Sequence, residues 1–485
     1  MTRLRLRPID PLIPLVVVLL ALGLGGTENE AEMPPEQPPT AAPVTISDPF
    51  ISLPSASLRE NSQLSTLNSQ PAALPLWREY LSGKRDLRVG LVKGVSKLSL
   101  YCEGDFQIFV DGAFLRDGNQ GEYITFSGEM KESVTLAAEE GEVWTVRIDG
   151  RPFPGRYPGK MEVFYAGGNG ETGLTLLNEV SVEEYVAGVA EKEMPSSFSL
   201  EALRAQSIAA RSYALSYLDR HEDDGFDLCA GTHCQVYRGK PDTFGPAQAA
   251  AFSTRRQIIV YEGQPVRTFY HSTCGGATAD GLFLAENSTN RAYLCGVLDA
   301  KAGAIPSGEK DISRFLSERS SGYCSISPKY RWQVSFTARE VDGFIQANLG
   351  QVLGQPWLRP GRVKSLRVGR RHGARAEVLE IDCEYGRYSL QGNTMRWLFH
   401  DAGDKFASRL MSTLFSLGVQ RDGSGEPTRY VFTGGGWGHG VGMCQWGAEG
   451  RARAGASATD ILSAYFPGTE LWTEKVSEES EDTNE

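Results

Sequence analysis

A carboxylate stands where a predicted helix should bury an apolar side chain. Ser181 followed three residues later by Glu184 is typical of a capping box, and it predicts a helix over 182–193. Apolar residues then recur at helical spacing, namely Val182, Tyr185, Val186 and Val189. Glu193 occupies the next position of this stripe, and Pro195 ends the helix just beyond it.

Burial at this position would give Glu193 a specific chemistry. Removal from water disfavours the ionised form of a carboxyl and raises its pKa. A carboxyl that keeps its proton near neutral pH is what a general acid needs. The alternative is structural, with Glu193 in a buried ion pair with Arg204 or Arg211, and the pattern alone leaves both interpretations open.

A second helix is predicted over 200–221, with Ser199 as its N-cap. Apolar residues cover so much of its circumference that we expect it to be buried. Arg204 and Arg211 are seven residues apart and share one face, which makes them candidates for substrate contact. The alternative is a packed core helix whose two arginines are structural.

A cluster of histidines and cysteines follows this helix: His221, Cys229, His233 and Cys234. Two thiolates and two imidazoles suit Zn²⁺ in a closed tetrahedral site. The spacing differs from that of a standard zinc finger, and outside the cytoplasm Cys229 and Cys234 could instead form a disulfide.

The chain has eight cysteines, an even number that permits disulfides in an exported protein. Cys274, Cys295 and Cys324 cluster in one region, and they are the first candidates to include a bridge. Spacing alone does not determine the connectivity.

Two glycine-rich segments, 270–276 and 434–447, combine flexible backbone with polar and aromatic side chains. Glycine lets a backbone approach a ligand closely, and neither segment matches a nucleotide-binding loop. The candidate binding residues in them are His271, Ser272, Trp437 and His439. The alternative is a set of tight turns packed around two tryptophans.

The elements around these motifs predict an α+β, strand-rich fold. Short alternating runs separated by Gly, Asp and Lys predict strands from residue 87 to about 182. Further strands are expected within 258–273, 331–340, 363–371, 376–383 and 388–392, and further helices within 311–319, 341–350 and 458–466. The sequence has no internal repeat, and the core is either one large domain or two interleaved ones.

Composition excludes two classes of protein. The net charge of −11 argues against general nucleic-acid binding, which needs many cations to neutralise phosphates. The ordinary share of hydrophobic residues, 41%, excludes a wholly disordered chain.

Both ends of the chain differ in composition from the core. Residues 1–26 pair arginines with a short apolar run, which predicts an export signal or, if uncleaved, an N-terminal membrane anchor. Residues 27–86 form a Pro- and Ser-rich linker and lead-in. Residues 473–485 carry six acidic residues and one lysine, and we expect a solvated tail. The protein should therefore act outside the cytoplasm, in the periplasm, cell envelope or medium.

Five motifs occur in one order along the chain: EEYVAGVAEKEMP, EALRAQSIAARSYAL, DLCAGTHCQVY, YHSTCGG and GWGHGVGMCQWGA. In this order they resemble the SpoIID/LytB family, over residues 87–472. The most diagnostic part is 173–283, and the closing motif lies in 430–472.

The resemblance implies a strand-rich SpoIID-like core with a few buried helices and a function in the cell wall. It implies a lytic transglycosylase that cuts peptidoglycan glycan strands between N-acetylmuramic acid and N-acetylglucosamine, leaving 1,6-anhydro ends. Glu193 corresponds to the family's catalytic acid, and the four His/Cys residues correspond to its zinc site, which we expect to be structural. The six candidate binding residues would then contact the glycan.

The resemblance also leaves alternatives open. LytB relatives are described as amidase enhancers, so a non-catalytic peptidoglycan-binding protein that stimulates a cell-wall amidase is the second hypothesis. A zinc-dependent peptidoglycan hydrolase is the third. The chain departs from the family pattern at Cys274 and Cys444, where serine is expected, and these two cysteines could pair with each other.

Overall fold

The computed structural model describes residues 75–166, 172–218, 220–241, 243–284, 292–400 and 409–475. The predicted signal at 1–26, the linker up to residue 74 and the tail from 476 onward lie outside the described residues. Within the described part, no helix has the length and apolar composition needed to cross a membrane.

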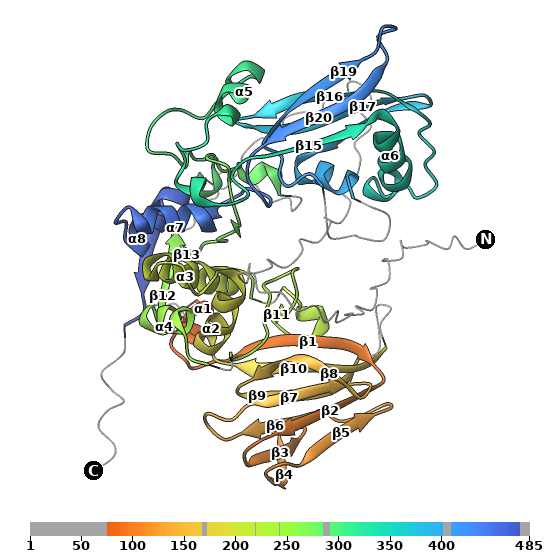
Figure 1. Cartoon of the computed structure of the whole chain (residues 1–485). Helices are drawn as coiled ribbons and strands as arrows, with labels where there is room; N and C mark the ends of the chain where they lie inside the picture. Colours follow the sequence, from red (N-terminus) through yellow and green to blue (C-terminus); the bar gives the residue numbers. More distant parts are fainter. Residues whose placement is uncertain are drawn as a thin grey trace, which may run out of the picture. The chain divides into compact units, whose positions relative to one another are not determined.

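The first part of the described chain is a pair of β-sheets with a shared core (Figure 1). One sheet has the strand order β11-β1-β10-β9-β6-β3-β4, and the other has the order β5-β2-β7-β8. The strands are β1 (Leu87–Val95), β2 (Lys97–Cys102), β3 (Phe106–Val110), β4 (Ala113–Gly118), β5 (Tyr123–Ser127), β6 (Val134–Ala138), β7 (Trp144–Ile148), β8 (Arg151–Tyr157), β9 (Lys160–Ala166), β10 (Gly173–Val180) and β11 (Leu228–Cys229). Phe106 on one sheet meets Trp144 on the other edge to face, with ring centroids 5.1 Å apart.

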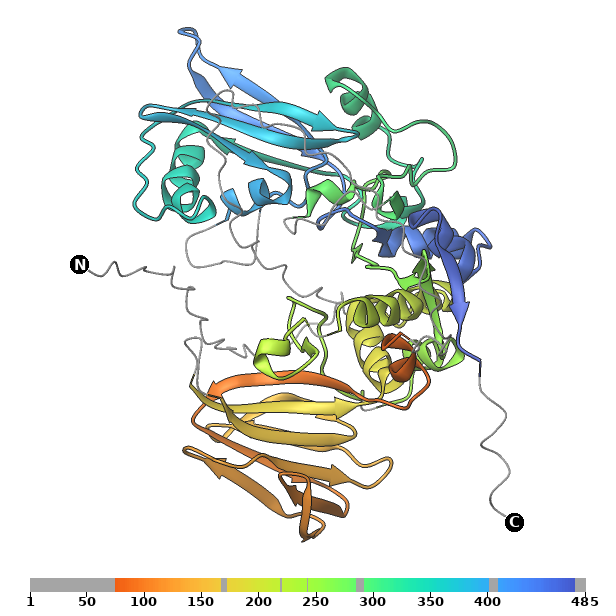
Figure 2. The same cartoon turned by 180° about the vertical axis from the view of Figure 1, so that it is seen from behind.

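Three helices come after β10 in the chain. They are α2 (Val182–Glu193), α3 (Leu200–Ser216) and α4 (Pro246–Ser253), and α2 and α3 lie side by side in both views (Figures 1 and 2). The Ser181 hydroxyl accepts a hydrogen bond from the Glu184 N–H at 3.3 Å, which confirms the predicted N-cap. Helix α3 is buried along most of its length, as predicted, and it ends at Ser216 rather than at residue 221.

Strands from segments that are distant in sequence pair with one another. Strand β12 (Gln257–Tyr261) lies between β13 (Gln264–Pro265) and β22 (Glu470–Thr473). Strand β14 (Tyr270–His271) pairs in parallel with β21 (Met443–Cys444), and α7 (Gln445–Arg453) and α8 (Ala458–Tyr465) follow β21. The two glycine-rich segments thus meet in the structure.

A separate hydrophobic core lies between β14 and β21 in the sequence. Its elements are β15 (Trp332–Thr337), α6 (Ala338–Val352), β16 (Val363–His372), β17 (Arg375–Cys383), β18 (Gly386–Gln391), β19 (Phe415–Arg421) and β20 (Pro427–Gly434). The stacked rings of Phe336 and Phe399, 5.6 Å apart, mark its centre. The core has its own sheets, and the choice between one large domain and two interleaved ones stays a prediction (Figure 1).

Several elements were not predicted from the sequence. A short helix, α1 (Trp77–Leu81), lies within the predicted lead-in, and its Trp77 and Tyr80 are buried. Helices α4 and α7 and strands β4, β8, β19 and β20 were also missed. The acidic tail was expected to be solvated, but its second residue, Glu474, forms an ion pair with Arg78 at 2.8 Å, because β22 brings it against α1.

The glycines of the second glycine-rich segment, 434–447, allow an unusual backbone conformation and close packing. Gly436, Gly438, Gly440 and Gly442 alternate along the chain, and all four have φ between +70° and +107°. This region disfavours residues with a Cβ. A Cβ on Gly442 would also collide with the carbonyl oxygen of Phe269, because the segment lies against the chain that leads into β14.

Replacement of Gly442 by alanine should therefore destabilise the fold by about 3 kcal/mol, the sum of left-handed strain and backbone collision. Gly455 is the matched control, because it has φ +93° and open space around its Cβ position. Gly455→Ala should cost only the strain, about 1 kcal/mol. Urea unfolding of the two variants measures the difference, and equal losses would contradict the packing argument.

Candidate functional site

Glu193 is the last residue of α2, and its side chain is buried with only 7% of its surface exposed. The stripe that leads to it, from Val182 to Val189, is buried as predicted. Desolvation raises the pKa of the Glu193 carboxyl to about 7, although contacts with Gln445, Tyr270 and the backbone of Val236 lower it in part. The carboxyl is thus half protonated near neutral pH.

A chain of hydrogen bonds orients the groups around this carboxyl. The Tyr185 hydroxyl donates to Oε1 of Gln235 at 3.2 Å, and Nε2 of Gln235 donates to the Tyr270 hydroxyl at 2.9 Å. Burial raises the pKa of Tyr270 well above its usual value, so this hydroxyl keeps its proton. Since the Tyr270 oxygen already accepts from Gln235, its own O–H is available to Glu193.

Gln445 contacts Glu193 from the opposite end of the chain. It is the first residue of α7, and its Nε2 donates to the Glu193 carbonyl oxygen at 3.0 Å. Tyr270, Gln235 and Gln445 were not predicted from the sequence. Each stands directly beside a motif residue that was singled out, but no local pattern distinguishes it.

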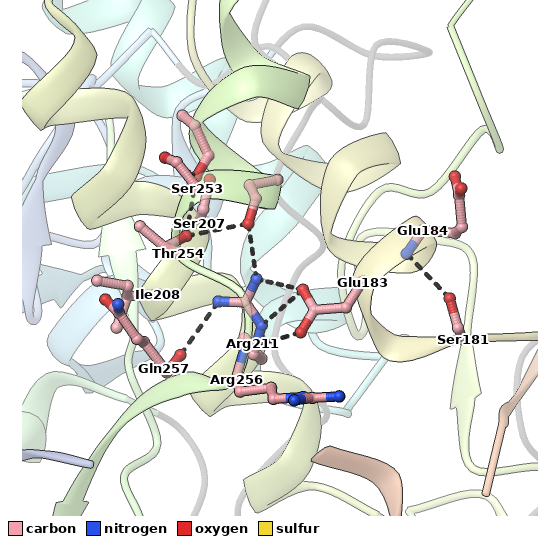
Figure 3. A network of polar contacts seen from close by, with 12 residues as sticks. Ser181, Glu183, Glu184, Ser207, Ile208, Arg211, Ser253, Thr254, Arg256 and Gln257 are labelled. Carbon is pink, nitrogen blue, oxygen red and sulfur yellow. Dashed lines mark hydrogen bonds and ion pairs between the residues drawn. The ribbon is translucent and has the colours of Figure 1, made fainter. Parts of the chain in front are cut away.

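The arginines of α3 do not pair with Glu193. Arg211 is fully buried and forms an ion pair with Glu183 at 2.6 Å, and it also donates to the carbonyl oxygens of Ala251 and Gln257 (Figure 3). Arg204 pairs with Glu201, also at 2.6 Å. The structural alternative for Glu193, an ion pair with either arginine, is therefore wrong.

This arrangement also corrects the assignment of Arg211 to substrate binding. A guanidinium with no exposed surface and with protein partners on all three nitrogens has no position left for a ligand. The seven-residue spacing predicted the shared face correctly, but it did not reveal that α2 and α4 cover this part of α3. Arg204 keeps a third of its side chain exposed, and its substrate contact stays a prediction.

The four His/Cys residues come together in space. One ligand atom from each of His221, Cys229, His233 and Cys234 lies within 4.8 Å of all the others. His221 Nε2 is 3.2 Å from His233 Nδ1 and 3.5 Å from the Cys234 sulfur. Hydrogen bonds from Cys234 and from both histidines lower the pKa of the Cys229 thiol.

The surroundings of the cluster also match a metal site. Asp224 lies 3.0 Å from His221 Nδ1, the ring nitrogen that faces away from the cluster. Histidine ligands of zinc usually donate their second N–H to such a carboxylate. Two nitrogens and two sulfurs at these separations fit Zn²⁺ in four-coordinate geometry.

The candidate residues of the glycine-rich segments lie along the β14–β21 pair and its loops. His271 is buried, which lowers its pKa to about 4, and its Nδ1 lies 3.1 Å from the Val441 carbonyl oxygen. His439 binds the Tyr270 carbonyl oxygen through Nε2 at 2.8 Å. Ser272 is buried, whereas Trp437 is half-buried with its backbone paired to Thr273. Glycan contact by these residues stays a prediction.

Two parts of the chain match known family models. The family model for stage II sporulation protein D, SpoIID, matches residues 170–261, which hold Glu193 and the His/Cys cluster. The chain therefore contains a region that is similar to the SpoIID family. A second model, a domain of unknown function (DUF8618), matches residues 286–442, which contain the separate core between β14 and β21.

The similarity to individual relatives covers more of the chain than residues 170–261. Stage II sporulation protein D of Bacillus subtilis is 29% identical over 310 residues, which are 61% of this chain and 75% of that protein. The amidase enhancer of Bacillus subtilis is 29% identical over 306 residues, and this chain spans 40% of its length. An uncharacterized protein of Brachyspira hyodysenteriae is 28% identical over 301 residues, 68% of its length.

Arg211 should matter for stability because its replacement leaves the partly buried Glu183 carboxylate without the cation that pairs with it. Arg211→Met is expected to lower the free energy of unfolding by about 3–5 kcal/mol. Arg204→Met on the same helix is the control, and loss of its half-exposed ion pair should cost less than about 1 kcal/mol. Chemical denaturation measures both, and a small effect at Arg211 would contradict its structural role.

Proposed function

We propose that the protein is an exported lytic transglycosylase that cleaves peptidoglycan glycan strands between N-acetylmuramic acid and N-acetylglucosamine. The observation that carries the proposal is the buried Glu193 carboxyl with a pKa of about 7. Such a group can both give and take a proton at neutral pH. The SpoIID match around this residue supports the choice of substrate.

The reaction needs a single acid/base. Protonated Glu193 gives its proton to the glycosidic oxygen as the bond from that oxygen to C1 of the muramic acid residue breaks. The 6-hydroxyl of the same sugar attacks C1, and its proton passes to the Glu193 carboxylate. The products are a 1,6-anhydro end and a free 4-hydroxyl, and Glu193 is again protonated.

A single residue suffices because the substrate supplies its own nucleophile. Hydrolytic glycosidases use two carboxyl groups on either side of the bond, one of which activates water or attacks the sugar. Tyr270 would donate a hydrogen bond to Glu193 when the carboxyl is ionised, after the first proton transfer. Gln445 and Gln235 would hold Glu193 and Tyr270 in place.

Zinc would be held by His221, Cys229, His233 and Cys234. Four protein ligands make a closed site of the structural type, whereas a catalytic zinc keeps one position for water. The metal would order the loop that carries Gln235 and Val236, which contact the Tyr270–Glu193 pair. This role makes a zinc-dependent hydrolase the weaker alternative.

A non-catalytic function is the second candidate, and the match to the amidase enhancer favours it. In this case the chain binds peptidoglycan and stimulates a cell-wall amidase. The two functions differ in what they require of Glu193, because an enhancer needs no proton transfer.

The products of digestion separate these functions. We expect the wild-type chain to release fragments with 1,6-anhydro ends from purified peptidoglycan or from peptide-stripped glycan, as measured by mass spectrometry. Glu193→Gln keeps the shape of the side chain but cannot release a proton, and it should lower the rate at least about a hundredfold. Glu191→Gln, two residues earlier on α2, is the control and should retain activity.

Absence of new ends from the wild-type chain on both substrates would contradict the transglycosylase proposal. Stimulation of an amidase that is equal for the wild type and Glu193→Gln would then support the enhancer function.

The pH dependence gives an independent test of the acid. Since Glu193 must carry a proton to begin the reaction, kcat/KM should fall as pH rises through about 7, by about tenfold per pH unit. Tyr270→Phe removes a hydrogen bond that stabilises the ionised carboxyl, so it should raise the pKa of Glu193 and move this limb to higher pH. Tyr430→Phe, in the separate core, should leave the profile unchanged; a shift to lower pH in Tyr270→Phe would refute the assigned contact.

A further inference from the structure

A second group of metal-ligating side chains lies in the interior of the protein. Cys274, Asp299, Cys324 and Cys444 each offer one ligand atom, and these atoms all lie within 4.8 Å of one another. All four side chains have no exposed surface. They come from four separate segments: the loop after β14, the segment at residue 299, the 3-10 turn Tyr323–Ile326 and the end of β21.

The separations match the edges of a tetrahedron around a single ion. The Cys274 and Cys324 sulfurs are 3.4 Å apart, and the Cys274 sulfur is 3.2 Å from Oδ2 of Asp299. Three thiolates and one carboxylate oxygen are a set that Zn²⁺ accepts in four-coordinate geometry. The set is too compact for an iron–sulfur cluster, whose ligands are spread over more than one iron.

Asp299 is oriented as a ligand that uses one oxygen. Its Oδ1 accepts hydrogen bonds from the Tyr465 hydroxyl at 2.8 Å and from Nε of Arg451 at 3.1 Å. Its Oδ2 faces the sulfurs. Such outer partners are typical of carboxylates that bind metal, because they fix the direction of the remaining oxygen.

The sulfurs accept hydrogen bonds from backbone N–H groups. Cys444 accepts from the N–H of Cys274 at 3.1 Å and from that of Gly447 at 3.2 Å. Cys274 accepts from the N–H of Gly276 at 3.3 Å. A neutral thiol is a weak acceptor, whereas hydrogen bonds to sulfur are a regular feature of metal-bound thiolates.

The charges around the cluster call for an anionic centre. Arg375 is buried, its Nε has no partner among the described residues, and it donates to the Cys274 and Ala277 carbonyl oxygens. Arg331 donates to the Gly275 carbonyl oxygen at 2.8 Å. In the described structure neither cation pairs with a carboxylate, whereas Arg451 pairs with Asp299.

Ionised thiols supply the missing charge. Three thiolates and one carboxylate carry −4, a bound divalent cation reduces this to −2, and Arg331, Arg375 and Arg451 face the result with +3. With neutral thiols, the same three cations would face only the single charge of Asp299. Arg375 is buried, and a buried charge without compensation is strongly disfavoured.

We propose that Cys274, Asp299, Cys324 and Cys444 bind a structural Zn²⁺ ion, distinct from the His/Cys cluster. Binding displaces the protons of the three thiols and forms three Zn–S bonds and one Zn–O bond. The ion joins the loop after β14 to the end of β21. It thereby fixes Tyr270 and Gln445, which lie four residues and one residue from Cys274 and Cys444 and contact Glu193.

A disulfide is the competing use of the same cysteines. A disulfide between any two of the three cysteines would leave the third as a lone thiol. It would also leave Arg331 and Arg375 without an anionic partner. Pairing of Cys274 with Cys444, suggested by the sequence, would also leave Cys324 beside Asp299. The metal uses all four groups at once.

Metal counting on the full chain tests the proposal. Purified wild-type protein should contain two zinc ions per chain by elemental mass spectrometry. The double variant Cys229→Ser/Cys234→Ser, which removes the other cluster, should keep one ion, and Cys274→Ser/Cys444→Ser should also keep one. Cys102→Ser is the control, because this buried cysteine belongs to neither cluster, and it should keep both ions.

X-ray absorption at the zinc edge on Cys229→Ser/Cys234→Ser identifies the ligands without any change to the proposed site. We expect about three sulfurs at ~2.3 Å and one oxygen at ~2.0–2.2 Å. Loss of all zinc from this variant would overturn the proposal. So would a disulfide between any two of Cys274, Cys324 and Cys444, found by peptide mapping of the unreduced wild-type protein. If Cys274→Ser/Cys444→Ser does not fold, the wild-type count and the absorption spectrum still decide.

Discussion

Removal of the Glu193 carboxyl from water is the interaction on which the candidate site depends. An exposed glutamate at the end of a helix would be ionised at neutral pH and could not act as an acid. Burial brings its pKa to about 7, and three groups limit the rise through hydrogen bonds. The balance is between desolvation, which favours the neutral carboxyl, and donors that stabilise the anion after proton transfer.

Each cysteine cluster lies next in sequence to a glutamine of the candidate site. Gln235 directly follows Cys234, the last residue of the His/Cys cluster, and Gln445 directly follows Cys444, the last cysteine of the buried cluster. Gln235 orients the Tyr270 hydroxyl, and Gln445 holds the end of α2 through the Glu193 carbonyl. The two glutamines that hold Tyr270 and Glu193 are therefore each attached to the last cysteine of a cluster.

The position of Glu193 could be predicted from the sequence, but the residues that surround it could not. The helical stripe placed Glu193 in the interior because spacing along one helix is a local property. Tyr270 and Gln445 lie 77 and 252 residues further along the chain, and only the parallel pairing of β14 with β21 brings them together. Arg211 was assigned wrongly for the same reason, since its partner Glu183 lies on a neighbouring helix. The strand-rich α+β class followed from alternation, whereas α7 was hidden by the glycines that precede it.

The position of the separate core has a consequence for the order in which the molecule is made. The chain from β14 to β21 contains the whole of that core, so the contact from Cys274 to Cys444 closes a loop of 170 residues. During synthesis, α2 emerges long before Gln445, so the contact between Gln445 and Glu193 forms only after residue 445 has been made. The entropic cost of loop closure grows only slowly with length, by about 0.6 kcal/mol per doubling. An insertion of this size therefore does not prevent assembly. A chain that stops before residue 445 therefore lacks Gln445, one of the groups that contact Glu193, and the candidate site is completed last.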